Sequence, residues 1–204
     1  METADNKVFI TMFHKFSFKY RNKVIDSETM KSEKLVKLFT YLLMNHQRSL
    51  PSSELADMLW YFEDIDNPIG ALKNLVYRLR ALLKKEFGMS DFITTGKGAY
   101  SINPAYTISM DVSDFDICNN DLTNAQGNEA ELYQRLIQLY RGKFLSEIKG
   151  DHNILSKSAY YHSIYIGRVI EYANLLEENK EYAEMERLAR NAIEIDDLEE
   201  DLYE

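Results

Sequence analysis

The hydrophobic pattern of the first hundred residues changes period several times, and each change predicts a different element. Residues 7–25 are rich in Val, Ile, Phe and Tyr, and within "KFSFKY" apolar and polar side chains alternate, which is typical of two or three short antiparallel strands. Residues 33–46 instead place leucines at three- and four-residue spacings directly after Ser32. This pattern predicts an amphipathic helix with Ser32 as its N-cap.

Two more helices are expected before residue 90. The segment "ELADMLW" predicts a short helix, and we expect Ser52 or Ser53 to cap its N-terminus. Residues 68–86 predict a longer helix, with Pro68 in its first turn and Gly88 at its end. Its expected buried face consists of Leu72, Leu75, Val76, Leu79, Leu82 and Leu83.

A β-hairpin is predicted directly after these helices. The segment "DFITTGKGAYSINP" has two β-prone runs separated by a turn that contains Gly96 and Gly98. Strands, three helices and a hairpin, in this order, are the elements of a winged helix-turn-helix. We therefore predict an α+β winged helix-turn-helix domain over residues 1–104.

The remaining residues, 105–204, predict an all-α second domain of tetratricopeptide-like helices. Residues 105–128 contain the turn-like stretches "SMDVSDFD" and "NNDLTNAQGN". From Glu129 the pattern predicts an amphipathic helix that ends near Arg141-Gly142, and then two helices over about 155–178 and 181–195.

The last forty residues follow the spacing of a helical repeat that begins at Ile166. Its packing positions are Val169, Tyr172, Ala173, Leu176, Met185, Ala189 and Ala192. Asp197 lies where a terminating proline is usual, and a next repeat would begin at Glu200, with Tyr203 at its first large position. Because a repeat stack needs a covered final face, we expect the chain to be a piece of a longer protein.

The charge is distributed unevenly along the chain. Residues 1–110 contain 15 Lys and Arg against 12 Asp and Glu, whereas the rest of the chain contains 9 against 21, within a total net charge of −9. The basic half is suited to nucleic acid or an anionic surface, which would repel the acidic half. The sequence thus indicates two modules with different partners.

Several classes of protein are not supported by the sequence. No apolar run is long enough to span a bilayer, the N-terminus lacks a signal-peptide pattern, and the single cysteine, Cys118, has no partner for an internal disulfide. We expect a cytoplasmic protein without a membrane partner. Neither a catalytic constellation nor metal-ligand spacing is present, so we expect no enzyme activity, no metal and no cofactor.

The whole chain resembles the SARP type of bacterial transcriptional activator, an OmpR-type winged helix followed by a bacterial transcriptional activator domain. The ordered segments that carry this resemblance are "FHKFSFKYRNKVI", "KLFTYLLMNHQRSLPSSELADMLW", "ALKNLVYRLRALL", "GKGAYSI", "MDVSDFD" and "LYRGKFL". Two positions depart from the family pattern. Lys143 replaces the usual proline after "RG", and Thr95 stands where OmpR-type wings often carry an arginine.

The resemblance implies that the helix over 68–86 is a recognition helix for the major groove of double-stranded DNA. Its expected exposed face offers Lys73, Asn74, Tyr77, Arg78, Arg80 and Lys84. Arg78 is the favoured base reader, because an arginine can pair bidentately with guanine, and Asn74 could pair with adenine. Arg80 and Lys84 are expected to grip phosphates. Alternatively, these residues form an ordinary solvated face.

Four further residues complete the expected DNA-binding set. Ser52 and Ser53, at the start of the second helix, offer hydroxyls and backbone N–H groups to a phosphate, the alternative being simple N-capping. Lys97 and Tyr100 belong to the expected wing, where Lys97 could reach the DNA backbone or remain a solvated turn residue.

Two functions of different classes remain open at this point. The first is a sequence-specific DNA-binding transcriptional regulator of the activator type, for which the resemblance implies dimers on direct repeats and RNA polymerase as a further candidate partner. The second is a protein-interaction scaffold, in which the helical repeat binds a partner and the winged helix no longer binds DNA. The salt dependence of DNA binding would discriminate between them.

Overall fold

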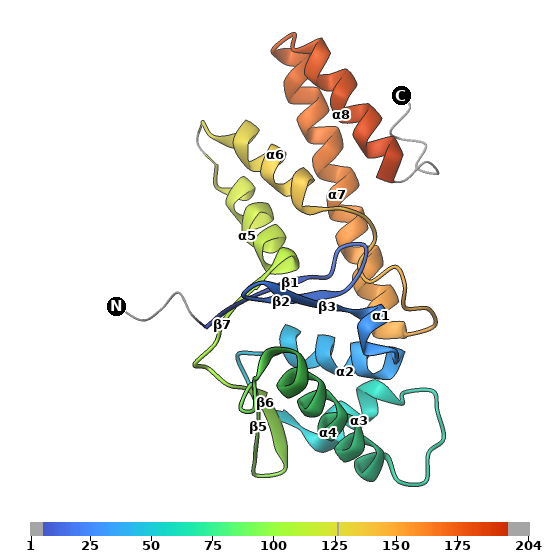
Figure 1. The fold of residues 1–204 in the computed structure, drawn as a ribbon. Helices are drawn as coiled ribbons and strands as arrows, with labels where there is room; N and C mark the ends of the chain where they lie inside the picture. Colours follow the sequence, from blue (N-terminus) through green and yellow to red (C-terminus); the bar gives the residue numbers. More distant parts are fainter. Residues whose placement is uncertain (1–5, 126, 196–204) are drawn as a thin grey trace. The chain divides into compact units, whose positions relative to one another are not determined.

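The computed structural model describes residues 6–125 and 127–195, which divide into two compact units. The first unit contains residues 6–10 and 16–109, and the second contains residues 11–15 and 110–195. The first is a winged helix, and the second is built from helices (Figure 1). The predicted fold class is thereby confirmed.

A four-stranded sheet opens the first unit. Its strands are β1 (Lys7–Thr11), β2 (Ser17–Tyr20), β3 (Lys23–Asp26) and β7 (Thr107–Met110), in the order β3-β2-β1-β7. Alternate residues of β1 and β2 are buried, as expected from their period of two. The buried side chains are Val8, Ile10, Phe18 and Tyr20. The predicted short N-terminal strands are therefore confirmed.

Four helices follow: α1 (Ser27–Met30), α2 (Glu33–Met44), α3 (Ser52–Leu59) and α4 (Pro68–Phe87). As predicted, Ser32 caps α2 by accepting the Leu35 N–H, and Gly88 ends α4 in the left-handed conformation at φ 74°. Asn67 caps α4 by accepting the Gly70 N–H at 2.8 Å. The start of α2 and both ends of α4 thus lie at residues that the local sequence specifies.

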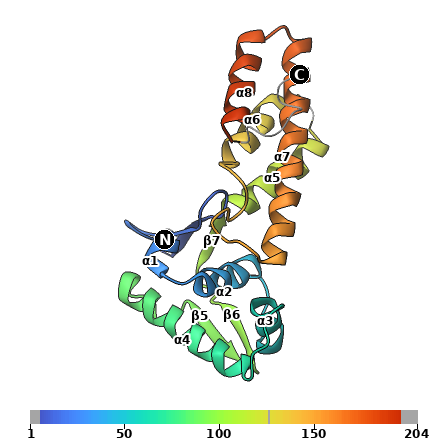
Figure 2. The same ribbon diagram turned by 90° about the vertical axis from the view of Figure 1, so that its right-hand side faces the viewer.

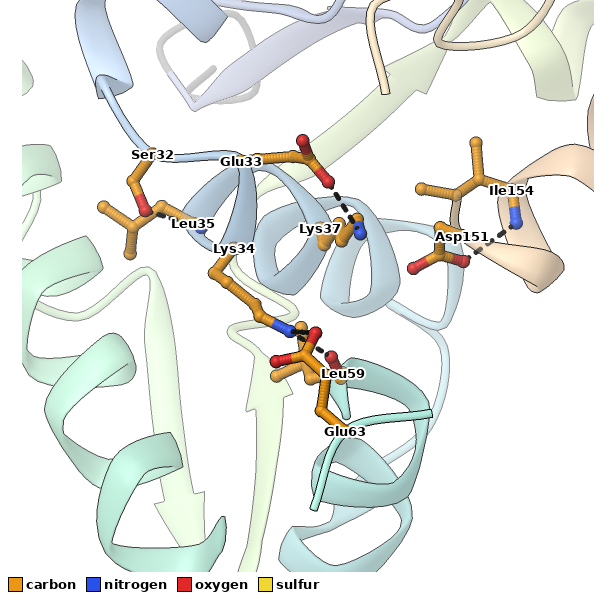
Figure 3. A network of polar contacts seen from close by, with 9 residues as sticks. All are labelled: Ser32, Glu33, Lys34, Leu35, Lys37, Leu59, Glu63, Asp151 and Ile154. Atoms are coloured by element: carbon orange, nitrogen blue, oxygen red, sulfur yellow. Dashed lines mark hydrogen bonds and ion pairs between the residues drawn. The ribbon is translucent and has the colours of Figure 1, made fainter. Parts of the chain in front are cut away.

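Lys34 fixes the start of α2 to the end of α3. Its Nζ donates to the Leu59 carbonyl at 2.7 Å and forms an ion pair with Glu63 (Figure 3). The ammonium also lies 5.4 Å from the centre of the Trp60 ring. This single side chain satisfies a carbonyl in the last turn of α3 and holds the start of the loop that leads to α4.

A second, three-stranded sheet forms the wing. Strand β4 (Leu50–Pro51) pairs with β6 (Ala99–Ile102), which pairs with β5 (Ile93–Gly96). Between β5 and β6, Lys97 and Gly98 both have positive φ angles, 50° and 75°. Two central residues with positive φ suit a tight hairpin turn, so the predicted hairpin is confirmed. Figure 2 shows this hairpin beside α4.

The second unit contains α5 (Asp111–Thr123), α6 (Glu129–Leu139), α7 (His152–Glu178) and α8 (Tyr182–Ile195). Helices α6, α7 and α8 pack in succession along the chain (Figure 1). Asp151 caps α7, its carboxylate accepting the Ile154 N–H at 3.1 Å (Figure 3). The positions Asp197, Glu200 and Tyr203, on which the next repeat was expected, lie outside the described residues.

One expectation about this unit was wrong. The stretch over 111–123 is a helix rather than turn-like chain, and it was missed because only Val112, Phe115 and Cys118 of it are buried, too few for a visible stripe. Helix α6 ends at Leu139, close to the expected Arg141-Gly142, because Tyr140 is already extended, with φ −82° and ψ 101°.

The segment 11–15 belongs to the second unit because α5 holds it there. The Asp111 carboxylate accepts the Met12 N–H at 2.9 Å, the Phe13 N–H at 3.0 Å and the Val112 N–H at 2.8 Å. Phe144 forms an antiparallel bridge with Phe13. A segment that precedes β2 in sequence thus completes a unit formed mainly from residues after 110.

Phe13 inserts into an aromatic cluster of the second unit. Its ring centre lies 5.2 Å from that of Phe115, 4.9 Å from that of Tyr140 and 5.3 Å from that of Tyr161. The side chain is only 2% exposed. Removing this residue from its position would therefore leave a large gap in the core.

The first prediction concerns the Asp111→Asn variant. The side-chain NH₂ group that replaces one carboxylate oxygen would face backbone N–H groups, which donate to that oxygen in the wild type. We expect the free energy of unfolding at pH 7 to fall by about 1–3 kcal/mol in urea titrations. Asp114→Asn, the same chemical change within the same helix, should shift it by less than about 0.5 kcal/mol. Equal effects of the two variants would contradict the role given to Asp111.

The second prediction concerns pH. Burial raises the pKa of Asp111 to about 6 from its ordinary value of 3.8, although its backbone N–H donors act in the opposite direction. The folded state therefore binds this proton more tightly than the unfolded state, and the resulting stabilisation is lost as pH rises through about 6. The excess stability of the wild type over Asp111→Asn should grow as pH is lowered from about 7 to about 5. A constant difference would show that the pKa is not raised.

Candidate nucleic-acid interface

Helix α4 separates its apolar and cationic side chains onto two faces. The buried side chains are Leu72, Leu75, Val76, Leu79 and Leu83, and Leu82, which was expected to be buried, is half-buried. The exposed face consists of Lys73, Asn74, Tyr77, Arg78, Ala81, Lys84 and Lys85. No acidic residue occurs between Pro68 and Lys85. This face therefore carries cationic and neutral side chains and no acidic one, and Tyr77 projects from it with 75% of its surface exposed.

Three cations of this face have no partner among the described residues. Lys73, Arg78 and Lys84 make no ion pair or hydrogen bond there. Two exposed arginines of α8, by contrast, are paired. Arg187 contacts Glu184 at 2.6 Å, and Arg190 contacts Glu186 at 2.6 Å. These three charges are thus available to an anionic ligand without first breaking an internal pair, whereas Lys85 forms an ion pair with Glu86 at 3.1 Å.

Arg80 is not one of these unpaired cations, and the expectation that its side chain lies on the exposed face was wrong. Its side chain turns toward the wing, where Nε and Nη2 donate to the Ile93 carbonyl at 3.1 and 2.8 Å. Nη2 also donates to Thr95 Oγ1 at 2.6 Å, and the guanidinium lies 5.9 Å from the centre of the Tyr100 ring. The guanidinium already serves as a link between α4 and the hairpin.

Tyr100 was expected to lie on the DNA-contacting surface of the wing, but its side chain packs inward. The residue is buried, with 6% of its surface exposed, and it pairs across the sheet with Leu50. Its position on β6 directs the ring into the first unit because alternate strand residues face the core. Tyr100 is therefore a packing residue of the wing.

Ser52 and Ser53 are not the N-cap residues of α3. Pro51 occupies that position, and no side chain caps the helix there. Ser52 instead donates its hydroxyl to the Gly98 carbonyl at 2.7 Å, and its backbone N–H donates to the same oxygen at 2.9 Å. The start of α3 thereby lies against the wing turn, while Ser53 is exposed.

The structure groups the remaining expected residues around the wing and α4. Lys97 is exposed at the tip of the wing turn. Ser52 donates its hydroxyl to the Gly98 carbonyl of the same turn. Sequence reasoning missed Lys85 as a member of the cationic face. It also missed Ile93 and Thr95 as the supports of Arg80, because no local pattern connects residues 13 and 15 positions apart.

The part of the chain that the structure describes was also searched for metal sites and membrane-spanning helices. Within it, no group of three or more His, Cys, Asp or Glu could hold a metal ion. No helix among the same residues is sufficiently long and apolar to cross a membrane.

Comparison with known proteins gives a likeness among solved structures. No family model and no curated protein matches the chain. Among solved structures, it is similar to EmbR of Mycobacterium tuberculosis in complex with a low-affinity phosphopeptide, with a TM-score of 0.61 and 14% sequence identity. The match covers 92% of this chain and 54% of the EmbR chain, so this chain spans about half the length of that structure. At this identity the likeness shows a shared fold.

The third prediction distinguishes Arg80 from Arg78 by the effect of each on the free energy of unfolding. Arg80→Ala removes the donors that satisfy the Ile93 carbonyl, so we expect the free energy of unfolding to fall by about 1–3 kcal/mol. Arg78→Ala removes an exposed, unpaired side chain and should change it by less than about 0.5 kcal/mol. Urea unfolding of both variants measures this difference. A loss in Arg78→Ala as large as that in Arg80→Ala would contradict the assignment.

Proposed function

We propose that this protein is a sequence-specific DNA-binding transcriptional regulator of the activator type, which reads the major groove with α4. The observation that carries the proposal is the exposed face of that helix. Its unpaired cations and exposed asparagine lie on one side of a helix whose other side is fixed in a core. A helix presented in this way, with a wing beside it, suits a groove of double-stranded DNA.

Each exposed residue has a role that fits its chemistry. Arg78 reads a guanine, because its free guanidinium can donate to the O6 and N7 acceptors together. Asn74, one turn nearer the N-terminus, pairs with adenine, while Lys73, Lys84 and Tyr77 contact phosphates. Ser53 and Lys97 are additional phosphate ligands at the ends of this surface.

The acidic composition of the chain is compatible with this function. The excess negative charge lies after residue 110, whereas the first 110 residues carry more basic than acidic side chains. At physiological salt, charges separated by more than about 8 Å are largely screened. Local attraction by α4 can therefore operate despite the net charge of −9.

The helical unit is proposed to provide the second half of a regulator. RNA polymerase or a second copy of the chain is its proposed partner, as the resemblance implies. A hollow of about 220 Å³ between α6, α7 and α8 offers one surface for a protein segment, with Tyr172 and Leu188 among its lining residues. That hollow also favours the alternative function, a protein-interaction scaffold without DNA binding.

The test, and the fourth prediction, is a fluorescence-anisotropy titration with a duplex from upstream of the protein's own gene. Affinity should fall steeply between 50 and 200 mM salt, with a slope of about −0.9 per phosphate contact. Arg78→Ala should weaken specific binding by about 5- to 150-fold, the range expected for one bidentate base contact.

Arg190→Ala is the matched control, because it removes an arginine from the helical unit and should leave DNA affinity unchanged. An equal loss of DNA affinity in both variants would show that the effect of Arg78→Ala arises from overall charge alone. If the wild type does not bind duplex DNA even at low salt, the regulator proposal fails and the scaffold function is favoured.

A further inference from the structure

The wing is attached to the helices along both of its edges. On one edge, β4 pairs with β6, and Ser52 at the start of α3 donates twice to the Gly98 carbonyl. On the other edge, β5 has no strand neighbour besides β6 in the described sheet. There Arg80 of α4 satisfies the Ile93 carbonyl and binds Thr95 Oγ1. The hairpin is therefore clamped between β4 and Ser52 on one edge and Arg80 of α4 on the other.

Lys97 is the cation that this clamp would position. It lies at the tip of the hairpin, one residue beyond the end of β5 and next to the carbonyl that Ser52 binds. Its φ of 50° places it in the tight turn that joins the two clamped strands. A change in the attachment of β5 to α4 would move this turn relative to Arg78 and Lys84.

We propose that Arg80 is a positioning residue for DNA binding, which sets the wing and Lys97 at the angle to α4 that lets both contact one duplex. This proposal rests on the proposed function and assigns Arg80 a role other than a phosphate ligand. The planar guanidinium suits the task because Nε and Nη2 can donate together to one carbonyl. A lysine could not reproduce that fork.

The competing role for Arg80 is a direct phosphate contact through its remaining Nη1 group. A double-mutant cycle between Arg80→Met and Lys97→Ala separates the two roles, because independent contacts add and coupled ones do not. If Arg80 positions the wing, Lys97→Ala should weaken DNA binding several-fold in the wild type and hardly at all in Arg80→Met. A parallel cycle of Arg78→Ala with Lys97→Ala should be additive.

The more conservative variant Arg80→Lys provides a second test. It keeps the charge and loses the fork, so the positioning role predicts DNA affinity close to that of Arg80→Met. A phosphate contact predicts affinity close to the wild type. Additive Arg80 and Lys97 effects, or full binding by Arg80→Lys, would overturn the proposal.

A readout without DNA keeps this inference separate from the proposed function. Amide hydrogen exchange in β5 and β6 should accelerate in Arg80→Met, and less strongly in Thr95→Val, which removes one hydrogen bond without altering α4. Arg78→Ala should leave these rates unchanged. Unchanged exchange in both Arg80→Met and Thr95→Val would overturn the clamp, whereas absence of DNA binding by the wild type would overturn only the DNA-reading role.

Discussion

The burial of one leucine face of α4 is the constraint on which the rest of the first unit depends. Leu72, Leu79 and Leu83 are each at most 1% exposed, so the helix cannot rotate without opening the core. That fixed rotation determines which side chains project outward. It leaves Arg78 free and, two residues later, turns Arg80 toward the hairpin. Residues two apart on an α-helix differ by roughly 200° in direction, which separates the two arginines chemically.

The second unit depends on a different constraint, the Asp111 carboxylate. It collects backbone N–H groups from its own helix and from the segment 11–15, a segment that precedes most of the first unit in sequence. Phe13 then fills the aromatic cluster with Phe115 and Tyr161. Because this unit takes part of its core from the N-terminal region, residues 110–195 alone do not contain the complete structure.

The parts of the fold that could be predicted are those whose signals are local. Ser32, Pro68 and Gly88 mark helix boundaries, and the leucine spacing of α4 and the turn at Lys97-Gly98 each specify their own conformation. Helix α5 could not be predicted because it carries no continuous apolar stripe. The segment 11–15 could not be assigned because its partners lie about 100 residues away.

The candidate site was predictable as a surface but not residue by residue. Lys73, Asn74, Tyr77, Arg78 and Lys84 are exposed as the helical period requires. Arg80, Tyr100 and Ser52 differ from expectation because each has a partner in the wing that only the tertiary structure reveals. Thr95, directly before the first wing glycine, is one of these partners, because its hydroxyl accepts a hydrogen bond from Arg80.

The central claim is that Arg78 reads a base from the exposed face of α4. Selection from a random-sequence duplex library, carried out in parallel with the wild type and Arg78→Ala, tests it most directly. The account predicts that the wild type enriches one motif and that Arg78→Ala loses the preference at a single guanine position while retaining the others. Enrichment of an identical motif by both proteins, or of none by the wild type, would contradict it.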